Sequence, residues 1–192
     1  MAPIPIPTIV TERLTLTPLT VADAEGLVEV YADQRMHEFT GGAPPSAMQL
    51  RERYEQLVVG RNHDGSEQWC NWIVRRHGCP DPVGTMQATI AHDLSEAAVA
   101  WEIGVDHQGR GLAAEAACAL VDWLLTSGIE RITATIHPDH AASAGVATHA
   151  GLVATDELDD GEIVWHRVTS SRERDVGKTR ASAPPGAATH QK

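Results

Sequence analysis

The chain has 192 residues, 42% of them hydrophobic and 21% charged, and its net charge at pH 7 is −11. These values fit one globular domain in the cytoplasm, because no apolar run is long enough to span a membrane and the proline-rich start lacks the basic region of a signal peptide. The acidic balance disfavours nucleic acid as a partner and suits a cationic amine, although an acidic surface mostly promotes solubility.

The sequence predicts no disulfide framework and a domain that ends before the last residues of the chain. Cys70, Cys79 and Cys118 form no CxxC pair, and their odd number argues against a disulfide framework, so we expect reduced thiols. Residues 169–192 include one large aliphatic side chain, which cannot offset the entropy of ordering the segment. We therefore expect a disordered tail over 169–192 and a single domain over 11–168.

The first third of the chain predicts a strand followed by two helices. Leu14 and Leu16 alternate with polar neighbours, as in a half-buried strand. Thr20 and Asp23 have the spacing of a helix N-cap and its acidic third position, and Ser46, after the breaker "TGGAPPS", begins a second helix. The inner faces are expected to carry Val21, Ala24, Val28 and Tyr31 in the first helix, and Met48, Tyr54, Leu57 and Val58 in the second.

The remainder alternates strands and helices. "QWCNWIVRR", "VGTMQATI" and "AAVAWEIGV" predict three successive strands, and a helix follows from about Leu112 to Thr126, with Gly128 at its end. "RITATI" predicts a strand, "ASAGVATHA" a short helix closed by Gly151, and "LVATDE" with "EIVWHRV" a terminal hairpin. The order β-α-α-β-β-β-α-β-α-β-β indicates an α+β domain around one mostly antiparallel sheet.

The stretch "VDHQGRGLAAEA" places Gly109, Arg110 and Gly111 directly before a helix. Glycines allow main-chain amides to point into one concavity, and these amides adjoin the positive end of the helix, which suits a phosphate or diphosphate. A plain tight turn is the simpler alternative. The GxGxxA dinucleotide fingerprint also matches, but a suitable preceding strand and a following acidic residue are missing, as is the lysine of a nucleotide-triphosphate loop.

The segment Gln108-Gly109-Arg110-Gly111-Leu112-Ala113 resembles the Q/R-x-x-G-x-G/A acetyl-CoA signature of the GNAT superfamily of acyltransferases. "TERLTLTPLTVADAEGL", "WEIGV" and "HPDHAASAGVATHAGL" are similar to its RimJ/RimL-like branch, in the same order and spacing. The resemblance covers about residues 11–168. It implies a mixed, mostly antiparallel sheet with a splayed central strand pair and flanking helices.

The resemblance also implies a site for acetyl-CoA, which would be a co-substrate. The splayed strands would be 97–105, carrying a bulge, and 131–136, and the gap between them would hold the pantetheine arm. Main chain near the end of the first strand would hold the thioester, and the glycine-loop amides would hold the diphosphate. The implied cofactor-binding residues are Ile103, Gly104, Val105, Gln108, Gly109, Arg110, Gly111, Leu112, Ala113, Ala114, His140 and Ser143.

The implied reaction is direct attack of an amine on the acetyl carbonyl, which requires a base and a donor for the developing oxyanion. An amide near Val105 is the oxyanion donor that the family implies. Glu102 is our candidate base, since strand alternation places it beside the small residues Ala98, Ala100 and Gly104. A structural glutamate paired with an arginine explains it equally well. His107 is a weaker candidate for the base.

The leaving thiolate needs a proton or a hydrogen bond. Many family members use a tyrosine on the helix after the splayed strand, but here the only tyrosines, Tyr31 and Tyr54, lie in the N-terminal helices. The N-x-x-S element of the family is His140-Ala141-Ala142-Ser143 in this chain. Ser143 is therefore the candidate contact of the CoA sulfur, with a plain helix cap as the alternative. The histidine substitution leaves the role of His140 open.

Other candidate residues give weaker signals. Glu38 and Phe39, in the region where the family forms acceptor loops, and Trp165, in the last hairpin, are candidate substrate contacts. All five tryptophans, Trp69, Trp72, Trp101, Trp123 and Trp165, are expected to be core or strand-pair residues. His137 and His140 are three residues apart, but no carboxylate or cysteine completes a ligand set, so we expect no metal.

Three hypotheses for the function follow. The first is an acetyl-CoA-dependent N-acetyltransferase that acts on a primary amine, either a protein N-terminus or a small molecule. The second is a catalytically silent acyl-CoA-binding module with a regulatory or interaction role, and the third is a nicotinamide-dependent enzyme. The sequence leaves the acceptor open among ribosomal-protein N-termini, an antibiotic amine, a polyamine and an amino acid. It also leaves a monomer and a homodimer open.

Overall fold

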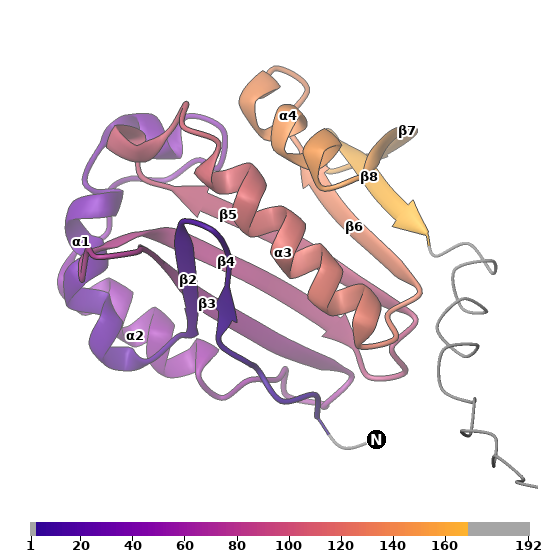
Figure 1. Cartoon of the computed structure of the whole chain (residues 1–192), viewed down its shortest axis with the longest axis horizontal. Helices are drawn as coiled ribbons and strands as arrows, with labels where there is room; N and C mark the ends of the chain where they lie inside the picture. Colours follow the sequence, from indigo (N-terminus) through magenta and orange to yellow (C-terminus); the bar gives the residue numbers. More distant parts are fainter. Residues whose placement is uncertain (1–2, 169–192) are drawn as a thin grey trace, which may run out of the picture.

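A computed structural model describes residues 3–168, which form one eight-stranded sheet with helices on both faces (Figure 1). The strand order is β1-β2-β3-β4-β5-β6-β8-β7. Every neighbouring pair is antiparallel except β5 with β6. The predicted α+β fold is therefore confirmed. The expected disordered tail, residues 169–192, lies outside the described residues.

The N-terminal elements begin at the capping residues that the sequence indicates. Thr20 and Asp23 form a capping box before the first helical segment, and Ser46 forms one with Gln49. Each box satisfies amides that a helix end leaves without partners. The elements are β1 (Ile9–Val10), β2 (Leu14–Pro18), the 3-10 turn η1 (Val21–Asp23), α1 (Ala24–Tyr31), the 3-10 turn η2 (Gln34–His37) and α2 (Ala47–Leu57).

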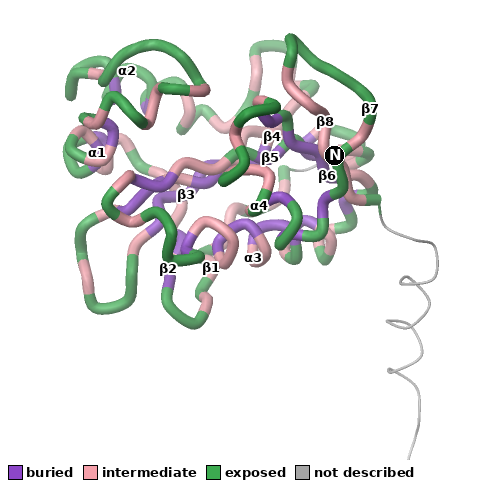
Figure 2. The backbone as a smooth tube through the Cα atoms, turned by 90° about the horizontal axis from the view of Figure 1, so that it is seen from above, coloured by how far each residue is buried: buried purple, intermediate pink, exposed green. Residues whose placement is uncertain are grey.

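The expected inner face of α2 is wrong in part. Leu50 and Tyr54, one helical turn apart, are buried against α1 and Ile73, whereas Met48 and Val58 are exposed. Met48 lies two residues before Leu50 and therefore on the opposite face of α2, and Val58 follows the last residue of the helix. The buried pair has the i, i+4 spacing of one helix face. α1 and α2 cover only one end of their side of the sheet (Figure 2).

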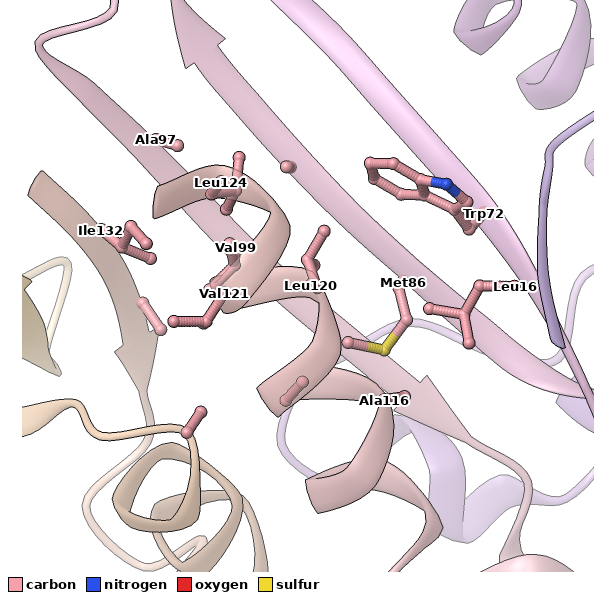
Figure 3. Close-up of a cluster of buried hydrophobic side chains, with 14 of the residues drawn as sticks. Leu16, Trp72, Met86, Ala97, Val99, Ala116, Leu120, Val121, Leu124 and Ile132 are labelled. Carbon is pink, nitrogen blue, oxygen red and sulfur yellow. The ribbon is translucent and has the colours of Figure 1, made fainter. Parts of the chain in front are cut away.

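The opposite face of the sheet is covered by α3 (Leu112–Thr126) and forms the main core (Figure 3). Ala116, Leu120 and Leu124 of α3 recur every four residues and are buried against the long central strands. Gly128, with a φ of +91°, ends the helix as expected. The central strands are β3 (Glu67–Arg76), β4 (Pro82–Ala91) and β5 (Glu96–Ile103), and the 3-10 turn η3 (Val105–His107) leads from β5 toward α3.

The C-terminal part returns to the sheet after α3. Gly151, with a φ of +81°, closes the helix α4 as predicted. Cys70, Cys79 and Cys118 are free thiols. Within the described part of the chain, no helix combines the length and the apolar character that crossing a bilayer requires. The elements are β6 (Arg131–Ile136), α4 (Ala141–His149), β7 (Val153–Asp159) and β8 (Glu162–Val168).

The strands β5 and β6 pair only at their beginnings. The parallel register ends at Ala98 opposite Thr133, while β5 stays paired with β4 up to Ile103. The two strands therefore part after Ala98, as the resemblance implies. The expected bulge is not found in the paired part of β5, because its register with β4 runs from Ala97 to Ile103 without a shift. The divergence arises instead where the β5–β6 pairing ends.

Candidate active site

The loop between η3 and α3 presents a row of unused main-chain donors. Gly109 and Gly111 have φ values of +69° and +74°, in the region that favours glycine. Gly111 is the N-cap of α3 and supplies no side chain to its amides. Among residues 3–168, no acceptor bonds to the amides of residues 109–114. Six consecutive amides at the positive end of a 15-residue helix form an anion site.

A positively charged side chain that the sequence analysis missed lies beside this loop. The Arg13 guanidinium donates to the Arg110 carbonyl oxygen at 2.9 Å, and its Nη2 lies 3.5 Å from where a Cβ on Gly111 would stand. Its Nε donates to the Glu115 carboxylate at 2.6 Å, which also accepts from the main-chain amide of Arg13 and the hydroxyl of Thr11. Arg13 thus fixes the loop to the first turn of α3. A sequence pattern could not show this contact across 102 residues.

Gln108 and Arg110 lie differently from the other loop residues. The Gln108 side-chain amide donates to the Ile103 carbonyl oxygen at 2.8 Å, so it ties the loop to the end of β5 and occupies that carbonyl. Arg110 is exposed, and its side chain is not part of the groove described below. The Arg110 carbonyl oxygen accepts the hydrogen bond from Arg13.

Two hollows meet where β5 and β6 part. A groove of about 760 Å³ runs along the glycine loop and the first turns of α3 and α4. A cavity of about 280 Å³ lies on the other side, between α2, the sheet and the start of β8. The predicted residues Ile103, Val105, Gln108, Gly109, Gly111, Leu112, Ala113 and Ala114 line the groove, and Gly104 is buried behind it. Residues common to both hollows are Phe39, Thr40, Trp101, Glu102, His140 and Ser143.

Glu102 stands at this junction, with partners other than the arginine that we considered. The Tyr31 hydroxyl donates to its carboxylate at 2.6 Å, and the Thr85 hydroxyl does so at 3.3 Å. Burial and, after it, the Glu102 charge raise the pKa of Tyr31 well above its ordinary value, so the hydroxyl stays a donor. A tyrosine from α1 therefore positions the candidate base, although it lies 71 residues away in sequence.

Ser143 lies at the same junction and is held by a tryptophan. It is the third residue of α4, whose N-cap is His140, so the helix-cap alternative does not describe it. The indole Nε1 of Trp101 donates to the Ser143 hydroxyl oxygen at 3.1 Å and so joins β5 to α4 across the parted strands. Trp101, expected only as a core residue, is half-buried at this junction.

Phe39 and His140 form one wall of the junction. Their rings are stacked, with centroids 4.2 Å apart and an angle of 13° between their planes. Partial burial lowers the pKa of His140 below its usual value, which favours the neutral ring. Phe39 borders both hollows, whereas its neighbour Glu38 borders only the groove.

The remaining candidate residues are not among those that border both hollows. Trp165 packs against the core cluster and borders neither hollow, since it lies on the opposite face of β8 from Glu162. His107 borders the groove, and its Nδ1 has no hydrogen-bond partner among residues 3–168. In the same part of the chain, His, Cys, Asp and Glu form no group of three that could hold a metal ion.

Comparison with known proteins agrees with the family resemblance of the sequence. The family model described as "Acetyltransferase (GNAT) domain" matches residues 13–153. A protein of Bacillus licheniformis named "Uncharacterized N-acetyltransferase p20" is 26% identical over 138 residues, which cover 71% of this chain and 76% of that protein.

Solved structures show the same fold. An acetyltransferase from Agrobacterium tumefaciens superposes with a TM-score of 0.67 and 25% identity, covering 88% of this chain and 98% of its own. RimL, a ribosomal L7/L12 α-N-protein acetyltransferase solved with coenzyme A, superposes with a TM-score of 0.70 and 16% identity, covering 85% of this chain and 97% of its own.

The contact between Arg13 and Glu115 predicts a pH-dependent contribution to stability. Burial acts to raise the pKa of Glu115, but hydrogen bonds from Thr11 and Arg13 outweigh it and hold the pKa below its usual 4.5. The stabilisation is complete above the unfolded-state value and is lost as the pH falls through the lower folded-state value. We expect Glu115→Gln to lower the free energy of unfolding by about 1–2 kcal/mol at pH 7, with a difference that shrinks below pH 4.5.

Urea denaturation of both proteins between pH 3 and 7 measures this difference. Glu55→Gln is the control, because Glu55 forms an exposed ion pair with Arg51 on α2 and such pairs contribute little. A Glu115→Gln difference that does not change with pH would contradict the assignment.

Proposed function

The chain belongs to the GNAT acetyltransferase family, and from this we propose that it is an acetyl-CoA-dependent N-acetyltransferase acting on a primary amine. The observation that carries the proposal is the junction of the two hollows. The groove ends at the same six residues as the cavity, among them a carboxylate and a hydroxyl. Two substrates that enter from opposite sides would meet there.

The groove has the features that acetyl-CoA requires. The free amides of residues 109–114, the N-terminus of α3 and the Arg13 guanidinium suit a diphosphate. A coenzyme A complex of the structural neighbour RimL supports this choice of ligand. Arg13 lies beside the loop but outside the residues that line the groove, and it is paired with Glu115, so in this acidic protein the main-chain amides supply most of the attraction for a polyanion.

The residues at the junction can perform the transfer without a covalent enzyme intermediate. Glu102, held by Tyr31, takes a proton from the substrate ammonium, directly or through water, and the nitrogen lone pair that this frees attacks the acetyl carbon. The amide bond forms as the carbon–sulfur bond breaks, and the nitrogen loses a second proton while the thiolate gains one and leaves as the free thiol. Ser143, held by Trp101, donates a hydrogen bond to the departing thiolate. The amide near Val105 that the family implies would stabilise the oxyanion.

The alternative of a catalytically silent acyl-CoA-binding module has no support in the comparisons, which relate the chain to acetyltransferases. The nicotinamide hypothesis is also disfavoured, because the sheet is mostly antiparallel and lacks the doubly wound order that dinucleotide binding uses. We also propose RimJ/RimL-like specificity for the amine acceptor, on which the transfer chemistry does not depend.

Thiol release from acetyl-CoA with a mixed panel of amines tests the function. We expect turnover by the wild type and a rise of about 5–10 °C in its melting temperature at a coenzyme A concentration a hundredfold above Kd. Gly111→Asp should lose both, because its carboxylate would occupy the anion site. Gly128→Asp, a glycine of positive φ beyond the other end of α3, should keep the rise. Protection of the wild type without turnover on any amine would favour a binding module.

The role of Glu102 predicts a large effect of a small change. Glu102→Gln keeps the shape of the side chain but cannot accept a proton, so turnover should fall about 10²–10⁴-fold and lose its dependence on pH. Glu96→Gln, on the same face of β5 where the strands are still paired, is the matched control and should retain turnover. Steady-state rates between pH 5 and 9 measure both. A Glu102→Gln variant with the wild-type rate would exclude Glu102 as the base.

The bond between Trp101 and Ser143 predicts a coupled pair. Trp101→Phe removes the indole donor and keeps most of the ring, so kcat should fall about threefold to tenfold because the Ser143 hydroxyl is no longer held. The same change in a Ser143→Ala background should have almost no further effect on kcat, because coupled residues are not additive. If the two effects simply multiply, Trp101 does not act through Ser143.

A further inference from the structure

Three hydrogen-bond donors border the cavity on the acceptor side. Asn71 is 6% exposed, and its side-chain nitrogen has no hydrogen-bond partner among residues 3–168. Tyr54 is 2% exposed, and its hydroxyl makes no close hydrogen bond with those residues, although it approaches the Tyr31 hydroxyl. Arg53 borders the same cavity from the exposed side of α2. Buried polar groups without partners are rare, and each requires an explanation.

The three donors come from two elements that face each other. Arg53 and Tyr54 lie on α2, and Asn71 lies on β3, on the sheet face that α1 and α2 partly cover. An amide nitrogen, a phenol and a guanidinium all donate, and together they suit a carboxylate or a carbonyl oxygen. Burial raises the pKa of Tyr54, which keeps its hydroxyl protonated.

The opposite side of the cavity has the complementary charge. The carboxylates of Glu102 and Glu162 border it, and Glu102 lies at the junction with the groove. This side suits the ammonium group that is to be acylated. The cavity is therefore acidic where it meets the groove and rich in donors at α2.

The strand register gives the distance between the two ends. Asn71 pairs with Gln87, which pairs with Ala100, and Glu102 is two residues further along β5. Two strand spacings and two residues of rise separate the backbones of Asn71 and Glu102 by about 12 Å. An acceptor that contacts both ends needs several bonds between its amine and its oxygen, more than the single carbon of an α-amino acid.

We propose that Arg53, Tyr54 and Asn71 form a subsite for a carboxylate or carbonyl oxygen of the acceptor, so that the preferred substrate is a primary amine bearing such an oxygen several bonds away. An ω-amino acid and the N-terminus of a short peptide both have this chemistry. Tyr54 and Asn71 border the cavity, but their polar atoms are buried, so the proposed contact requires their side chains to turn toward the ligand. This inference rests on the proposed function and specifies its acceptor.

A matched set of acceptors tests the subsite. With acetyl-CoA, kcat/KM should be at least tenfold higher for 5-aminopentanoate and 5-aminopentanamide than for pentylamine, which has the same chain without oxygen. Glycine, whose amine and carboxylate are one carbon apart, should lack the advantage. In dialaninamide the second carbonyl lies further from the amine than the carboxylate of glycine does. Its use as an acceptor distinguishes a peptide substrate from a small-molecule substrate. Equal use of pentylamine and the oxygen-bearing amines would overturn the subsite.

Variants locate the preference at the three residues. Arg53→Gln and Asn71→Leu should each reduce the ratio of kcat/KM between 5-aminopentanoate and pentylamine about tenfold, mainly through KM. Arg51→Gln, on the same helix but outside the cavity, and Thr133→Val, a buried hydroxyl outside it, are the controls. An equal loss in Arg51→Gln would show a general effect of charge and overturn the proposal.

A stability measurement distinguishes a binding role from a structural one. The Tyr54 hydroxyl makes no close hydrogen bond and only approaches that of Tyr31, so Tyr54→Phe should leave the melting temperature within about 2 °C of the wild type while the preference for the oxygen-bearing amine falls. A fall of more than about 4 °C would indicate that the hydroxyl serves the fold, which would overturn its role in the subsite.

Direct binding keeps this inference separate from the proposed function. If no amine is acetylated although coenzyme A binds, the proposed function fails, and calorimetry with 5-aminopentanoate on the coenzyme A-loaded protein still tests the subsite. Binding by the wild type that Arg53→Gln weakens about tenfold would support it. Absence of binding by the wild type would overturn it.

Discussion

The parting of β5 and β6 is the constraint on which the site depends. If the two parallel strands stayed paired, the main-chain groups of β5 would be used in hydrogen bonds to β6. The two hollows would then not be connected. Here the pairing stops at Ala98, while β4 holds β5 in register up to Ile103. One edge of β5 is hydrogen-bonded to β4, and the other edge is unpaired after Ala98. Trp101 and Glu102 therefore border the opening from a fixed backbone. Rigid elements position reacting groups better than loops do.

An acidic chain can still hold an anion because the attraction is local. The amides of residues 109–114 are neutral dipoles, and their alignment with α3 gives them a positive field that the net charge does not remove. Arg13 lies beside these amides but is paired with Glu115, so the positive field at the loop comes mainly from the aligned amides. The same carboxylate fastens the turn between β1 and β2 to α3, so the glycine loop and the edge of the sheet share one anchor.

The sequence predicted the fold well and the site in part. Periodicity and capping residues indicate local structure, which is why the strands, the ends of α3 and the glycine loop agree with the structure. The contact of Tyr31 with Glu102 and that of Trp101 with Ser143 span 71 and 42 residues and depend on how the elements pack. Periodicity contains no such information. The predicted inner face of α2 was wrong at Met48, which lies on the face opposite Leu50, and at Val58, which follows the end of the helix.

Two hollows that open on different sides of one junction also have a kinetic consequence. In the proposed reaction both substrates are held at once, in hollows that share the Phe39–His140 stack as a wall. That reaction proceeds through a ternary complex, with no acylated side chain that carries the group from one partner to the other. Each product would then leave through its own hollow, so release of one would not await departure of the other.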